Sequence, residues 1–341
     1  MLESVQLATS KEVGLLNVKH LKRYWHKNRL LISGEIEQEN LLDEWNIDIT
    51  LLGVLNIGIE QTIKYLYQEN PDFETLEKWI LHLNNGKLNN FKIEQFNNYI
   101  DTMKVAYVAN ETEDRVLSES DMNFWNENGY IILRNAVSKE DCECTIEAIC
   151  NYIEIDRYNS STWYSPHEAK QGIMVQLFQH PALEKNRNSP IIRKAYEQLW
   201  QRKDLWINAD RVGFNPPETE TWKFPGPRMH WDVSLKMPIP FGTQGILYLA
   251  DTAYNQGAFS LVPGFHNTIE TWLHNLPSDV QPRNEDIYSL GVQPIVANAG
   301  DFIIWHHALP HGSSVNSSNQ PRFVQYMNYE PLDAFKQDKW I

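Results

Sequence analysis

The stretch His230-Trp231-Asp232 decides how the rest of this chain is interpreted. Side chains alternate along a β-strand, so a histidine and a carboxylate two residues apart face the same side. This is the only His-x-acid triplet in the chain, and it follows the loop Pro225-Gly226-Pro227. Much farther along stand a second histidine, His311, and then Arg322.

Four side chains in these stretches indicate one kind of metal chemistry: His230, Asp232, His311 and Arg322. Two histidines and one carboxylate suit a non-haem Fe(II) ion with open coordination positions. An arginine offers a planar fork for a carboxylate co-substrate. The pattern therefore favours an oxygenase. The same ligands also suit zinc, so a Zn-dependent hydrolase is an alternative, although it leaves Arg322 without a role.

The second half of the chain predicts a β-rich domain. From about residue 205 the apolar runs are short, and Pro and Gly stand between them. Many short strands with such turns are typical of a sandwich or barrel of the jelly-roll kind. The predicted strands are 205–207, 244–249, 258–262, 302–305 and 323–327.

The first hundred residues predict helices instead. Phe73, Leu76, Trp79, Ile80 and Leu83 follow one another at spacings of three and four, which makes one apolar stripe of a helix. Asn70-Pro71-Asp72 resembles the start of that helix and Asn85-Gly86 its end. We expect residues 1–105 to form a helical N-terminal unit of unknown role. A polar junction at 108–120 then leads to a second domain over 115–341.

The composition bounds the class of protein. The chain has 341 residues, of which 42% are hydrophobic and 22% charged, which are ordinary globular values. A net charge of −14 argues against a nucleic-acid backbone or an anionic membrane surface as partner. Three closely spaced cysteines make no disulfide framework, and neither a signal peptide nor a membrane-spanning run is apparent. We expect a cytoplasmic protein.

The segment 229–327 resembles the phytanoyl-CoA dioxygenase family of Fe(II)- and 2-oxoglutarate-dependent oxygenases. The start of that family's domain is matched by Asn128-Gly129-Tyr130, so the likeness covers about residues 115–341. The motifs that carry it, besides His230-Trp231-Asp232 and Arg322, are the run from Gln244 to Thr252, Gly257-Ala258-Phe259, Val262-Pro263-Gly264-Phe265-His266 and Pro310-His311-Gly312-Ser313.

This resemblance implies a fold, a set of cofactors and a role for each residue. The fold is mainly β with α: a double-stranded β-helix, jelly-roll or cupin-like, with the metal in its mouth. Fe(II) is the metal, 2-oxoglutarate the co-substrate and O2 the oxidant. The implied catalytic metal ligands are His230, Asp232 and His311; Arg322 takes the distal carboxylate of 2-oxoglutarate, and Ser313 and Tyr248 line its pocket. His306 and His307 match the ligand position less well than His311.

The resemblance also narrows the reaction. Related halogenases replace the carboxylate ligand with a small residue, whereas Asp232 is retained here, so we expect hydroxylation, or another two-electron oxidation, of a small-molecule substrate, free or linked to a carrier or CoA. The helical unit is a candidate for self-association or for docking a carrier protein. A non-catalytic jelly-roll binding protein is the other alternative, and it is disfavoured because all four residues are intact.

Overall fold

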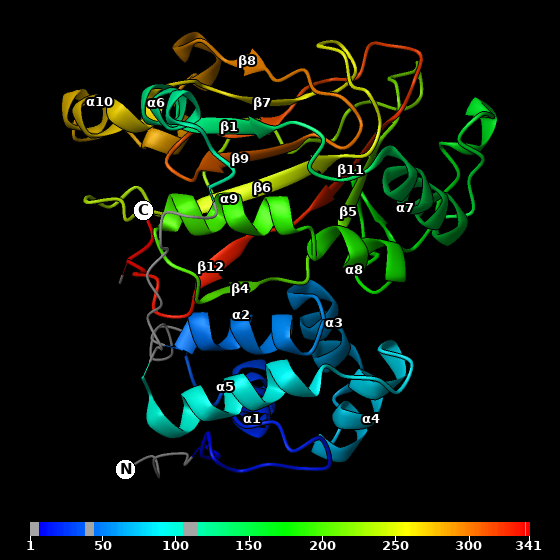
Figure 1. The fold of residues 1–341 in the computed structure, drawn as a ribbon, viewed down its shortest axis with the longest axis vertical. Coiled ribbons are helices and arrows are strands. Elements are labelled where there is room, and N and C mark those ends of the chain that lie inside the picture. The colour runs from blue at the N-terminus through cyan, green and yellow to red at the C-terminus, as the bar shows by residue number, and fades with distance from the viewer. Residues whose placement is uncertain (1–6, 38–43, 105–114, 338) are drawn as a thin grey trace. The chain divides into compact units, whose positions relative to one another are not determined.

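A computed structural model of the chain describes residues 7–37, 44–104, 115–337 and 339–341. It contains helices and antiparallel sheets, with helices at the N-terminal end (Figure 1). The chain divides into two compact units: one draws on 1–108, 203–210 and 330–334, the other on 109–202, 211–329 and 335–341. The sequence did not indicate that two later segments group with the N-terminal helices. Part of the expected junction, 105–114, lies outside the described residues.

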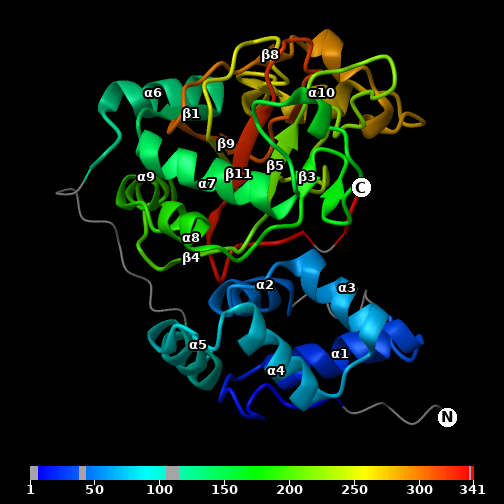
Figure 2. The same cartoon turned by 90° about the vertical axis from the view of Figure 1, so that its right-hand side faces the viewer.

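Within the described residues, the first unit combines five helices (Figure 2) with a two-stranded sheet (Figure 1). Its core takes in Leu51, Leu76 and Phe96 from the helices together with Leu332, and Trp206 packs against it. Thus the later segments contribute apolar side chains to the helical core. The elements are α1 (Leu21–Ser33), α2 (Trp45–Val54), α3 (Ile59–Glu69), α4 (Phe73–Leu83), α5 (Asn90–Thr102), β4 (Leu205–Ile207) and β12 (Tyr329–Pro331).

The helix predicted from the apolar stripe is confirmed as α4. The Asp72 side chain accepts a hydrogen bond from the Thr75 N–H and so caps its first turn. Pro71 lies directly before this cap, so Asn70-Pro71-Asp72 leads into the helix as predicted. Leu76 and Ile80 are buried on the core side.

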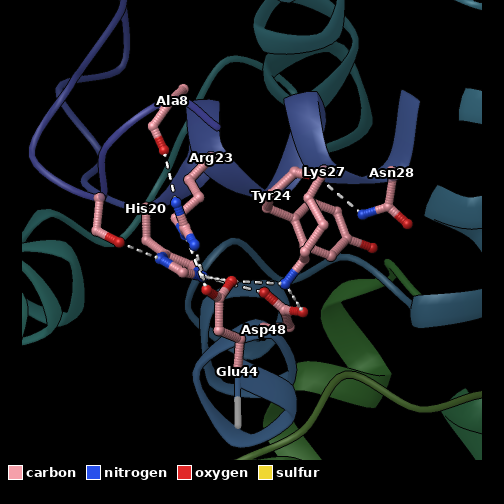
Figure 3. Close-up of polar contacts among 9 residues, drawn as sticks. Ala8, His20, Arg23, Tyr24, Lys27, Asn28, Glu44 and Asp48 are labelled. Carbon is pink, nitrogen blue, oxygen red and sulfur yellow. Dashed lines mark hydrogen bonds and ion pairs between the residues drawn. The ribbon is translucent and has the colours of Figure 1, made fainter. Parts of the chain in front are cut away.

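A network of charged side chains joins α1 to the start of α2 (Figure 3). The Lys27 Nζ atom lies 2.9 Å from Glu44 Oε2 and 2.5 Å from Asp48 Oδ2. His20 Nε2 is 3.1 Å from Asp48 Oδ1, and Arg23 is 2.6 Å from Glu44 Oε1. His20, Glu44 and Asp48 have the composition of a metal site. The Lys27 ammonium, however, already lies between the two carboxylates, and together with Arg23 it balances their charge, so the network acts as an ionic link between helices.

The second unit is built on two antiparallel sheets. The larger has the strand order β1 (Tyr130–Leu133), β9 (Phe302–His306), β6 (Thr243–Tyr248), β11 (Arg322–Tyr326), β5 (Val212–Asn215), β3 (Met174–Val175) and β2 (Lys170–Gln171). The smaller has the order β10 (His311–Ser313), β7 (Phe259–Leu261) and β8 (Gln293–Pro294). The predicted strands are therefore present: β4 has the predicted bounds, and the ends of the other four differ by at most one residue.

Side chains along each strand point alternately to the two faces of the large sheet. Each face is covered by other elements. Ile303 and Val324 join the core shared with the small sheet. On the other face, Gln325 Oε1 accepts from Asn186 of α8 at 2.8 Å. Figure 1 shows β7 and β8 on one side of the large sheet and α8 and α9 on the other. The helices are α6 (Glu119–Asn128), α7 (Lys139–Tyr152), α8 (Pro181–Arg187), α9 (Pro190–Trp200) and α10 (Ile269–Asn275), with short 3-10 helices at Ser160–Thr162, Phe265–Asn267, Pro282–Asn284 and Ile287–Leu290.

The structure also bears on the cysteines and on membrane-spanning helices. Helix α7 carries all three cysteines, and none of them forms a disulfide. Among the residues that the structure describes, no helix combines the length and apolar character needed to cross a bilayer.

Candidate metal centre

The two histidines singled out from the sequence are held side by side by backbone hydrogen bonds. His230 N donates to His311 O and His311 N donates to His230 O, both at 2.9 Å. Two residues that exchange both bonds in an antiparallel pair lie directly opposite, with their side chains on the same face. The imidazole centroids are accordingly 4.7 Å apart. The distal strand β10 thus brings His311 to the segment that carries His230.

Asp232 completes a three-residue cluster. Its Oδ1 atom lies 3.3 Å from His230 Nε2, and its Oδ2 atom lies 3.3 Å from His311 Nε2. One ligand atom from each residue lies within 4.8 Å of the others. His311 is buried, whereas the Asp232 side chain is 51% exposed. The cluster therefore opens to solvent on the Asp232 side.

The hydrogen bonds of the two rings assign their tautomers. His230 Nδ1 lies 2.7 Å from Arg228 O, and His311 Nδ1 lies 3.2 Å from Leu309 O. A carbonyl oxygen only accepts, so each Nδ1 carries a proton and Nε2 is the nitrogen that faces Asp232, where a neutral ring would offer its lone pair to a metal. Metal-binding histidines are usually oriented in this way by a partner on the far nitrogen. The donor set therefore fits a divalent cation.

The electrostatics of the cluster keep the carboxylate ionised. Desolvation acts to raise the pKa of Asp232, but hydrogen bonds with His230 and His311 lower it far below its usual range. Desolvation lowers the pKa of His230, but the hydrogen bond with Asp232 outweighs it and the pKa is raised. The carboxylate thus carries a full negative charge at neutral pH, as a ligand of Fe(II) requires.

Gly312 separates the two strand positions that face the cluster. A Cβ atom there would lie 2.7 Å from Arg228 O and 3.0 Å from Met229 N. Both contacts are with backbone, which cannot rotate away. Glycine therefore lets the segment carrying His230 approach β10 closely enough to form the paired hydrogen bonds.

Arg322, the first residue of β11, is fully buried at 0% exposure. It lies beside β10, the strand that carries His311. Its NH2 donates to Ser313 Oγ at 3.1 Å, while Nε and NH1 have no hydrogen-bond partner. Ser313 stands two residues after His311 on β10 and so faces the same side. A buried guanidinium with two unpaired donors is costly unless an anion binds there. This arrangement fits the carboxylate of a bound organic acid.

Tyr248 lies in the same core, and its hydroxyl is engaged by backbone. The hydroxyl donates to Ile295 O at 2.9 Å and accepts from Phe259 N at 2.8 Å. Burial raises the pKa of Tyr248 to about 12, although the charge of Arg322 acts in the opposite direction. Tyr248 is thus near Arg322, and its hydroxyl links β6 to the small sheet.

The other histidines near the distal strand lie outside the cluster. His306 Nδ1 accepts from Ala308 N at 3.1 Å, and His307 Nε2 lies 2.5 Å from Pro240 O. Burial lowers the pKa of His306 to about 3 and that of His307 to about 4, so both rings are neutral. Neither belongs to the group formed with Asp232.

Two polar residues near the cluster were not singled out from the sequence. Gln244 Nε2 donates to Asp232 Oδ2 at 2.7 Å. Asn215 is buried opposite Arg322 in the register of β5 and β11, and its Oδ1 has no partner. The predicted strand 244–249 could have indicated Gln244. Side chains alternate along a strand, so Gln244 shares its face with Ile246 and Tyr248 of the core.

A third such residue, Arg283 of the 3-10 helix Pro282–Asn284, contacts the residues on both sides of Asp232. Its NH1 donates to Trp231 O at 2.9 Å and its NH2 to Val233 O at 2.6 Å. The guanidinium also bonds Ile341 O and lies 4.6 Å from the Trp340 ring centroid. No sequence pattern indicates this contact, because its partners are 50 and 52 positions away along the chain.

Two comparisons of the sequence with known proteins find the same family name. The family model described as phytanoyl-CoA dioxygenase (PhyH) matches residues 125–324, more than half of the chain. A curated Dictyostelium discoideum protein, whose name provisionally places it among phytanoyl-CoA dioxygenases, is 24% identical over 263 residues, which are 62% of this chain and 75% of the relative.

Solved structures resemble the chain more distantly. The non-haem α-ketoglutarate-dependent epimerase SnoN from nogalamycin biosynthesis is 14% identical with a TM-score of 0.45, covering 62% of this chain and 82% of its own. HygX from Streptomyces hygroscopicus, solved with nickel and 2-oxoglutarate, is 13% identical with a TM-score of 0.45, covering 63% and 88%. Similarity this low bears on neither reaction nor substrate.

Proposed function

The chain belongs to the phytanoyl-CoA dioxygenase family, and we propose that it is a hydroxylase of a small-molecule or carrier-linked metabolite. Membership in this family makes it a non-haem oxygenase that uses Fe(II), 2-oxoglutarate and O2. The hydroxylation, the kind of substrate and the roles of individual residues are the proposal. Its metal ligands are His230, Asp232 and His311.

The observation that carries the proposal is the unpaired guanidinium of Arg322 beside the three-residue cluster. Two residues along a strand, or about 7 Å, separate His311 from Ser313, the residue that Arg322 contacts. A five-carbon diacid is long enough to reach from a metal at His311 to Arg322. A zinc hydrolase would leave this buried charge without a partner.

The residues of the chain would divide the work as follows. His230, Asp232 and His311 would hold Fe(II), which together with 2-oxoglutarate and O2 supplies the oxidising power and yields succinate and CO2. Arg322 and Ser313 would bind the distal carboxylate of the co-substrate and orient it. The rings of Phe259 and Trp305, whose centroids lie 6.0 and 5.1 Å from that of His311, keep water from this side of the site.

We propose further that the two sheets form the double-stranded β-helix typical of such oxygenases. The antiparallel pairing and the apolar core that both sheets share support this assignment. The cluster then lies where β10 meets the segment that carries His230.

The proposal is tested by anaerobic titration with Fe(II) and 2-oxoglutarate. The intact protein should develop the visible charge-transfer band of iron-bound 2-oxoglutarate, and His230→Ala should abolish it. His306→Ala, a neutral histidine outside the cluster, is the matched control and should keep the band. With metabolites screened for stimulated succinate formation, the product should gain one oxygen atom from labelled O2.

Other outcomes would favour the alternatives. A binding protein without turnover would show neither band nor succinate. A hydrolase would be active with zinc and indifferent to 2-oxoglutarate. A product that lacks the labelled oxygen would leave the oxygenase family assignment in place and overturn hydroxylation.

A further inference from the structure

Gln244 connects the carboxylate of Asp232 to the interior of the large sheet. Its Nε2 donates to Asp232 Oδ2 at 2.7 Å, and its Oε1 accepts from Trp305 Nε1 at 3.1 Å. Gln244 and Trp305 stand directly opposite each other in the register of β6 and β9. The glutamine is therefore held at both ends of its amide.

The orientation of this amide is determined by chemistry. An indole N–H only donates, so the oxygen of the Gln244 amide must face Trp305. The amide nitrogen then necessarily faces Asp232 and donates to the ionised carboxylate. Trp305 is 3% exposed, so the indole is itself fixed by packing.

This contact makes the two oxygens of Asp232 unequal. Each oxygen lies 3.3 Å from one imidazole nitrogen, Oδ1 from His230 Nε2 and Oδ2 from His311 Nε2, but Oδ2 alone accepts from the Gln244 amide. If Asp232 bound a six-coordinate metal through one oxygen, beside two histidines, three coordination positions would stay open. If it bound through both oxygens, only two would stay open, and 2-oxoglutarate would need both of them.

We infer that Gln244 is a positioning residue that makes Asp232 a one-oxygen ligand and so preserves the coordination position for O2. This inference rests on the proposed function. Gln244 would touch neither the metal nor the co-substrate. It acts through the hydrogen bond that restrains the carboxylate.

Two substitutions separate this role from a general contribution to folding. Gln244→Leu removes both hydrogen bonds at similar size, and Gln244→Glu keeps an acceptor for Trp305 but places an acceptor against Asp232. Gln198→Leu is the matched control, because the Gln198 amide also bonds at both ends, to the backbone of Val116 and Leu117.

The measurements follow ligand binding at the metal and do not depend on turnover. The charge-transfer band reports 2-oxoglutarate on iron, and nitric oxide, as a substitute for O2, reports the remaining position through the electron paramagnetic resonance signal of its iron complex. In both Gln244 variants we expect the band to persist while nitric oxide binds about tenfold or more weakly. The wild type and Gln198→Leu should show both signals.

Each result decides the question. Nitric oxide affinity equal to that of the wild type in Gln244→Leu and Gln244→Glu would overturn the inference and leave the proposed function intact. Loss of iron itself from both variants would also overturn it, because the inference requires the ligands to stay in place. A wild-type protein without the band would overturn the proposed function and the inference together.

Discussion

At the scale of single residues, Gly312 controls how closely two backbone segments approach. In Gly312→Ala the new Cβ atom would collide with the backbone of Arg228 and Met229. We expect a loss of about 1–3 kcal/mol in unfolding free energy, together with weaker binding of divalent metal, because the pairing of His230 with His311 is disturbed. Denaturant unfolding and calorimetric titration with Co(II) measure the two effects.

Gly291→Ala is the control for this prediction. Gly291 has a φ of 92° but nothing within 4 Å of its Cβ position, so alanine there is strained without a collision. Its stability should fall while its metal affinity is unchanged. Equal loss of metal affinity in both variants would contradict the argument.

Arg322 offers a second prediction at this scale, because its charge is buried and no carboxylate among the residues that the structure describes pairs with it. Arg322→Leu removes a guanidinium with two unpaired donors and replaces it with an apolar side chain. We expect thermal stability to be unchanged or higher, while 2-oxoglutarate affinity falls by about 100-fold or more. Thermal melts and calorimetric titration of 2-oxoglutarate check this pair. A variant that loses stability and keeps its affinity would show that Arg322 has a structural role.

At the scale of elements, Lys27 holds α1 to the start of α2. Lys27→Met leaves Glu44 and Asp48 close together without the ammonium that lies between them. Breaking one side of a buried ionic network costs about 3–5 kcal/mol, which should be visible in denaturant unfolding. Lys78→Met removes an exposed pair with Glu74 on α4 and should change stability little. Similar effects of the two substitutions would refute the distinction.

The same network predicts a pH dependence. Burial alone would raise the pKa of Glu44, but hydrogen bonds from Arg23 and Lys27 lower it below its ordinary value of 4.5. The unfolded chain therefore takes up the proton first as the pH falls, and the stabilisation present at neutral pH is lost below about 4.5. Because Gln resembles protonated Glu, the stability difference between the wild type and Glu44→Gln should shrink over that range. Hydrogen exchange of the α1 and α2 amides measures it, and a difference independent of pH would contradict this origin.

At the scale of the whole molecule, the helical unit is not a separable N-terminal segment. Trp206 and Leu332, from segments 203–210 and 330–334, belong to its core. Deletion of residues 1–108 should leave these apolar side chains in water and cause aggregation, seen by size-exclusion chromatography and dye binding. Trp206→Gln with Leu332→Gln should restore solubility to the truncated chain. A truncated chain that is soluble without these changes would show that the later segments stand alone.

Much of the local structure could be predicted from particular residues. The stripe from Phe73 to Leu83 predicted α4, and the short apolar run after Gln244 predicted β6. These patterns are legible because a helix and a strand each repeat with a fixed period. The grouping of β4 with the helical unit was not predicted, because a short apolar run carries no information about the partner against which it packs.

The candidate site, too, could be predicted from the sequence only in part. Residue types and the spacing of His230 and Asp232 were enough to propose a metal and an organic acid, since a ligand set restricts the metal it suits. Only the tertiary structure brought Asp232 within reach of His311, across 79 positions. It alone placed Gln244, Asn215 and Arg283 around them. Contacts of this kind depend on how strands register and how loops return, and neither is encoded in a local pattern.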